Sequence, residues 1–212
     1  MPNPSPQLRD ASASSPPSGR VDRRVQEFRA RVLTTAEELF AERGIEATKI
    51  DDICDAADVA KRTLCNHFPT KAHIVQALSR EAVSKMVARI DAARDAGGST
   101  RARLEILFDS FFAGGEGVGP VHRESVGAFF GAAHGTPEAS EGEIRVSDAI
   151  QALLAVGGPE QLPTGASVET FATVVLGSIY ATTLEWVHRE DYDVEARTSE
   201  AGRFLASLLP PA

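Results

Sequence analysis

The chain contains very little cysteine, two residues in 212, Cys54 and Cys65. It has no Cys-x-x-Cys spacing and no larger cysteine framework, so a structural disulfide is not expected. Cys65 and His67 lie two residues apart, which turns them to different faces of a helix and argues against a shared zinc ion. We therefore expect two buried or neutral thiols and no metal site, with a redox switch as the alternative.

The sequence also lacks a long hydrophobic run. The longest uncharged, apolar-leaning stretch is residues 170–184, which is shorter than the roughly 20 residues that span a bilayer. The first twenty residues contain no apolar segment of the kind found in a signal peptide. We therefore expect a cytoplasmic protein with no membrane partner. Residues 1–19, rich in Pro and Ser, are expected to form a disordered tail.

Motifs that carry catalysis are missing as well. Gly115, Gly117 and Gly119 are spaced like a phosphate-binding loop, but no strand pattern precedes them and no Lys-Ser/Thr pair follows. A plain loop is the better interpretation. The chain has no nucleophile elbow and no His-Glu metal motif. We expect neither an enzyme nor a bound cofactor.

What is present favours an all-α fold with an uneven charge. Gly and Pro cluster between apolar segments of helical period, and no strand-period alternation persists. The net charge is −8, yet residues 1–72 hold 11 basic and 11 acidic residues, so the whole excess lies beyond residue 72. Because phosphate repels an acidic body, the neutral end is the one suited to face DNA.

Residues 48–68 have the pattern of two short helices joined by a tight turn. Thr48 followed by Asp51 has the spacing of a capping box. Asp58 falls at the turn, where its side chain tolerates a left-handed backbone. Leu64 and Phe68 fix the inward face of the second helix. The side chains left outward suit phosphate oxygens and base edges: Lys61, Arg62, Thr63, Asn66 and His67.

With its neighbours, this motif resembles the N-terminal domain of TetR-family transcriptional regulators over residues 25–78. The resemblance rests on Glu42-Arg43-Gly44, Ala57-Asp58-Val59, His67-Phe68-Pro69 and Lys71, in fixed register. The family usually has Ala, Gly and an aromatic residue where this chain has Cys54, Asp58 and Cys65.

The resemblance implies a three-helix helix-turn-helix domain at residues 20–70 and a helical effector-binding and dimerisation domain at 71–212, with about nine helices in all. It implies a sequence-specific regulator, a repressor released from its operator by a small-molecule effector. Its partners would be palindromic double-stranded DNA, the effector and a second copy of the chain. The residues expected at DNA are Thr48, Lys49, Lys61, Arg62, Thr63, Cys65, Asn66, His67 and Lys71.

Two further sets of residues are expected in the second domain. Phenylalanines in adjacent predicted helices, with polar groups nearby, favour a pocket for an apolar or aromatic, neutral or cationic effector; the alternative is plain core packing. That set is Phe108, Phe111, Phe112, Phe129, Phe130, His134, Tyr180, Glu185 and Trp186. The predicted dimer interface is Ile150, Leu153, Leu154, Phe171, Val175 and Ile179.

Two other functional classes remain open at this stage. One is a helical ligand-binding protein whose DNA-binding motif has decayed, which Cys65 alone supports. The other is a nucleoid-type DNA binder without an effector, which fits the overall acidity poorly.

Overall fold

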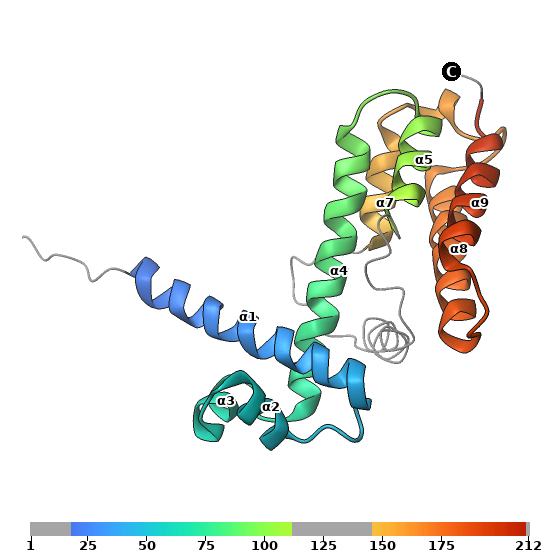
Figure 1. Ribbon diagram of the computed structural model, residues 1–212. Coiled ribbons are helices and arrows are strands. Elements are labelled where there is room, and N and C mark those ends of the chain that lie inside the picture. Colours follow the sequence, from blue (N-terminus) through green and yellow to red (C-terminus); the bar gives the residue numbers. More distant parts are fainter. Residues whose placement is uncertain (1–17, 112–145, 211–212) are drawn as a thin grey trace, which may run out of the picture.

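The computed structural model describes residues 18–111 and 146–210, and within them the chain is helical with no strand. The predicted all-α class is confirmed. The helices, labelled as in Figure 1, are α1 (Ser18–Arg43), α2 (Ile50–Ala57), α3 (Lys61–His67), α4 (Lys71–Asp95), α5 (Thr100–Ser110), α7 (Val146–Ala155), α8 (Val168–His188) and α9 (Val194–Ser207), with a short 3₁₀ turn at Pro159–Gln161.

Helix boundaries follow local capping signals. The Ser99, Ser167 and Asp193 side chains accept hydrogen bonds from the third backbone N–H of α5, α8 and α9, as N-cap residues do. Gly97 and Gly98, both at positive φ, form the turn between α4 and α5. Helix α1 begins at Ser18, so the last two residues of the expected disordered tail are helical, and residues 1–17 lie outside the described residues.

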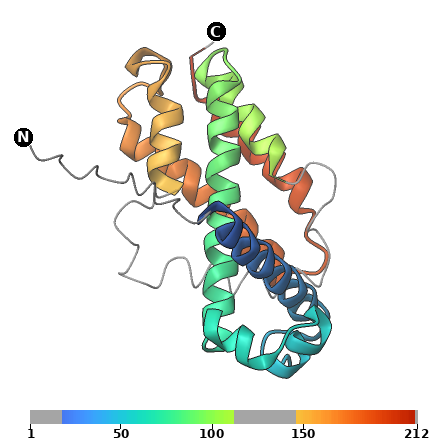
Figure 2. The same cartoon turned by 90° about the vertical axis from the view of Figure 1, so that its left-hand side faces the viewer.

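Helix α4 joins two separate hydrophobic cores (Figures 1 and 2). Its first half contributes Ile74 and Leu78 to the core formed with α1, α2 and α3. Its second half contributes Ile90 and Ala93 to the core formed with α5, α7, α8 and α9. One continuous helix therefore links the two parts, and no helix among the described residues has the length and apolar character needed to cross a membrane.

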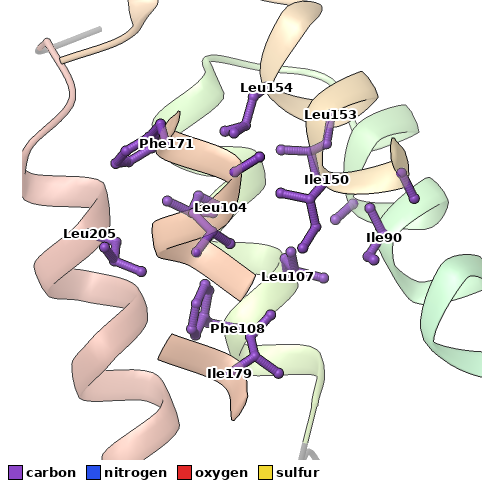
Figure 3. Close-up of a cluster of buried hydrophobic side chains, with 14 of the residues drawn as sticks. Ile90, Leu104, Leu107, Phe108, Ile150, Leu153, Leu154, Phe171, Ile179 and Leu205 are labelled. Carbon is purple, nitrogen blue, oxygen red and sulfur yellow. The ribbon is translucent and has the colours of Figure 1, made fainter. Parts of the chain in front are cut away.

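The residues expected at a dimer interface lie instead inside the second core, where Figure 3 shows several of them meeting α5. All six are at most 4% exposed within a single chain, so they cannot form a surface for a second copy. The prediction was wrong for Ile150, Leu153, Leu154, Phe171, Val175 and Ile179.

Helices α5 and α9 approach each other closely at Gly202. A Cβ placed on Gly202 would lie 2.4 Å from Cβ and 2.6 Å from Cγ of Phe108. Glycine is therefore required for this contact, which positions Phe108 in the core beside Leu205 (Figure 3).

Candidate nucleic-acid interface

The turn between α2 and α3 forms as the sequence predicts. Asp58 adopts a left-handed backbone, with φ 52° and ψ 55°, which Asp tolerates better than most residues. The Val59 N–H donates to the Cys54 carbonyl at 3.0 Å. Ile53 and Leu64 are fully buried on either side of the turn, and this packing fixes the orientation of α3 against α2.

Helix α2 begins one residue later than the predicted capping box. Lys49 is the N-cap residue, and its N–H donates to the Asp52 carboxylate at 2.8 Å. The Thr48 hydroxyl instead donates back to the Gly44 carbonyl at 2.8 Å. Since Thr48 is only 1% exposed, the prediction that it contacts DNA is wrong, and it closes the loop after α1.

Helix α3 presents a polar outward face. Lys61, Arg62, Thr63 and Asn66 are exposed. The Lys61 ammonium lies 2.7 Å from an Asp51 carboxylate oxygen, and this hydrogen bond raises the pKa of Lys61. The face therefore combines donors and acceptors of the kinds that read base edges and phosphates.

The end of α3 packs against α1. The His67 ring is half-buried, with its centroid 4.8 Å from that of Phe28, so only part of the imidazole is available outward. The Arg29 guanidinium lies 4.6 Å from the centre of the Phe68 ring, a cation–π contact. Sequence reasoning missed Phe28 and Arg29 because α1 and α3 are far apart in the chain.

Lys71 has a different role from the one expected. Its ammonium donates to the carbonyls of Ile45 at 2.6 Å, Glu46 at 3.2 Å and Thr48 at 3.2 Å. These three bonds use all three N–H donors of an ammonium group. The side chain therefore ties the start of α4 to the loop between α1 and α2, and this replaces its predicted phosphate contact.

The two cysteines differ in environment. Cys54 is buried and Cys65 is half-buried. Burial, with the nearby Asp51 carboxylate as the next cause, raises the pKa of the Cys54 thiol. Cys54 is therefore a neutral, buried thiol at ordinary pH, as its sequence context predicts.

The predicted effector residues do not converge within the described part of the chain. Phe108 and Phe111 form a buried edge-to-face pair with centroids 6.2 Å apart. Trp186 is 1% exposed, whereas Glu185 lies at the surface and pairs with Arg189 at 3.5 Å. Tyr180 is half-buried, which raises its pKa. The other predicted members lie outside the described residues: Phe112, Phe129, Phe130 and His134.

A hollow of about 220 Å³ instead opens between α5 and α9. Phe108, Glu105, Asp109, Ser199 and Arg203 line it. The Ser199 hydroxyl donates to the Asp109 carboxylate at 3.0 Å across this hollow. Its two walls are about ninety residues apart in sequence, so local patterns could not have predicted it.

The packed two-helix motif with an exposed polar second helix defines a helix-turn-helix protein. Comparison with known proteins agrees: the family model described as "Bacterial regulatory proteins, tetR family" matches residues 32–78. Over residues 32–78 the chain is therefore similar to bacterial regulators of the TetR family.

Named relatives match over half of the chain or less. The repressor KstR2 of Mycobacterium tuberculosis (strain ATCC 25618 / H37Rv) is 36% identical over 107 residues, 50% of this chain and 52% of that protein. The activator FasR of Mycolicibacterium smegmatis is 33% identical over 86 residues, 41% of this chain and 39% of that protein. The chain thus spans about half or less of the length of these relatives.

Solved structures match over most of the chain. FadR from Bacillus subtilis, in complex with stearoyl-CoA, has a TM-score of 0.63 at 19% identity and covers 84% of this chain and 97% of its own. FadR from Bacillus halodurans has a TM-score of 0.65 at 17% identity, with 84% and 93% covered. At these identities the likeness concerns the fold alone.

Proposed function

We propose that the chain is a sequence-specific DNA-binding transcriptional repressor, active as a homodimer and released from a palindromic operator by a small-molecule effector. The observation that carries the proposal is α3, which buries Leu64 and exposes Arg62 and Asn66. A short helix held by its inner face presents its outer face to the major groove, where Arg reads guanine and Asn reads adenine.

A dimer is supported by an apolar face that a single chain leaves uncovered. On α8 and α9, Leu184 is 60% exposed and Phe204 64% exposed, and Val174 and Leu208 are exposed on the same two helices; exposed apolar side chains that are grouped in this way mark interaction surfaces. On α8, Leu184 is continued at helical spacing by small and apolar residues. The proposed interface residues are Val174, Gly177, Ala181 and Leu184 of α8 and Phe204 and Leu208 of α9.

Effector release requires a mechanical link, and α4 supplies one. The Arg89 guanidinium donates to the Phe111 carbonyl at the end of α5, at 3.1 Å. At the opposite end of α4, Lys71 holds the loop before α2. A ligand that shifts the end of α5 can move the helix-turn-helix through α4, by no more than its differential affinity for the two states allows. Acyl-CoA thioesters are the first compounds to screen, since one structural relative was solved with stearoyl-CoA.

The competing proposal is a ligand-binding protein with a decayed DNA-binding motif, which Cys65 supports, since the family usually has an aromatic residue there. A gel-shift assay with the DNA upstream of the chain's own gene, at two salt concentrations, distinguishes the two. The wild-type chain should shift this DNA and not an unrelated duplex, and both Arg62→Ala and Asn66→Ala should weaken the shift. Lys85→Ala, on the exposed side of α4, is the matched control. If neither Arg62→Ala nor Asn66→Ala weakened the preference for this DNA over the unrelated duplex, the proposal would be contradicted.

A further inference from the structure

The helix-turn-helix itself has too little positive charge to hold DNA by attraction. Residues 48–70 contain three cations, Lys49, Lys61 and Arg62, against four aspartates. One of the cations, Lys61, is already paired with Asp51. Because neutralisation of phosphates supplies much of the affinity of a protein for DNA, another element must contribute it.

The first half of α1 has the missing charge. Residues 18–31 contain five arginines and two acidic residues, whereas the second half of α1 is acidic. This half lies before residue 32, where the family match begins. In Figure 1 it projects past α3 and away from α4.

Two of these arginines flank Phe28, the residue of α1 that packs on the end of the recognition helix. Phe28 packs on His67 at the end of α3, at 4.8 Å. Arg24 is four residues before Phe28 and Arg31 three after, so both lie within about 60° of the same side of α1 at roughly 100° per residue. Both are exposed, and neither forms an ion pair with a described residue.

Arg23 provides an internal contrast. It lies about 100° around the helix from Arg24, and it pairs with Glu27 at 3.4 Å. Two neighbouring arginines of α1 are thus in different settings: Arg23 is paired with Glu27, and Arg24 is exposed with no ion-pair partner among the described residues.

We propose that the first half of α1 is a second DNA-contacting element, in which Arg24 and Arg31 bind phosphates of the strand bordering the groove occupied by α3. Guanidinium groups match phosphate oxygens in a bidentate geometry. The phosphate backbone runs alongside any helix that lies in a groove, so side chains next to α3 come within reach of it. This inference rests on the proposed DNA-binding function and extends the protein–DNA contact beyond the helix-turn-helix.

The test is the salt dependence of operator binding, measured by fluorescence anisotropy of a labelled duplex. Each lost phosphate contact reduces the slope of log K against log salt by about 0.9. The double variant Arg24→Ala/Arg31→Ala should therefore reduce the slope by about 1.8 per subunit. Arg23→Ala should leave the slope unchanged, and Arg24→Lys/Arg31→Lys should largely restore it because the charge is kept. Hydroxyl-radical footprinting should show the loss of protected sugars beside the groove in the alanine variant only.

The outcomes separate this inference from the proposed function. A wild-type slope and footprint in the alanine variant, with Arg62→Ala still defective, would overturn the role of α1 and leave the regulator intact. An equal reduction of the salt slope in Arg23→Ala would also overturn it. The effect would then come from the total positive charge of α1 and not from Arg24 and Arg31. A wild-type chain that binds no DNA would overturn both. Unchanged urea unfolding of the variants verifies that the fold is kept, as expected for exposed side chains.

Discussion

Replacement of Lys71 by methionine tests whether this residue stabilises the fold or binds DNA. The change keeps the apolar stem and removes the ammonium that donates to the Ile45, Glu46 and Thr48 carbonyls. A cation in the first turn of a helix is ordinarily unfavourable, because the N-terminal end of the helix dipole is positive. These three carbonyl oxygens explain why lysine is tolerated at the first position of α4.

The expected cost of Lys71→Met follows from this geometry. Net contributions of hydrogen bonds to charged groups are about 1.5–3 kcal/mol each when buried. Lys71 is half-buried, and the carbonyl of Glu46 is exposed, so water can replace part of the interaction. We expect a total loss of about 1–2 kcal/mol in the free energy of unfolding, or roughly 2–8 °C in Tm for a chain of this size.

Two measurements decide between the roles. Urea unfolding followed by circular dichroism should show the loss in Lys71→Met, whereas Lys85→Met should change stability by less than about 0.5 kcal/mol, since its pair with Glu81 is exposed. The salt slope of operator binding should be the same as in the wild type. An unchanged unfolding curve together with a slope reduced by about 0.9 would refute the structural role and restore the phosphate contact.

Four further changes have defined expectations. Gly202→Ala should destabilise the chain by about 1–3 kcal/mol in urea unfolding, because the new methyl overlaps Phe108. Asp58→Gly should stabilise it by about 0.5–1 kcal/mol, since glycine adopts the left-handed backbone without strain. Leu184→Glu should convert the proposed dimer to a monomer in light scattering while the helical circular dichroism signal is kept. For thiol alkylation, the raised pKa of Cys54 keeps it protonated to higher pH, so mass spectrometry at pH 8 should find Cys65 labelled first and Cys54 only after unfolding.

The helix-turn-helix was predictable because its signals are local. The apolar spacing of Ile53 and Leu64 and the turn residue Asp58 lie within a dozen positions, and each acts on its own part of the backbone. The start of α2 was misplaced by one residue for a non-local reason. Thr48 is a good N-cap residue by type, but its hydroxyl donates to the carbonyl of Gly44, just after α1, instead of accepting from α2.

The proposed dimer face could not be separated from the core by sequence. Helix α8 is apolar on nearly all sides, so Phe171, Val175 and Ile179 have the same hydrophobic character as Val174 and Leu184. Only the packing of α7 and α9 against α8 decides which of its residues are buried. Lys71 presents the same difficulty, because its partners lie more than twenty positions away.

The charge distribution also bears on how the proposed complex achieves specificity. Non-specific affinity for DNA grows with the number of phosphates neutralised. The residues around α3 are on balance acidic, and one of their cations is held by Asp51. Attraction near the groove is therefore weak, and the contribution of Arg24 and Arg31 is the same for every sequence. Discrimination between the operator and other DNA consequently depends on base contacts by Arg62, Thr63 and Asn66, because the phosphate contacts of Arg24 and Arg31 are made with any sequence.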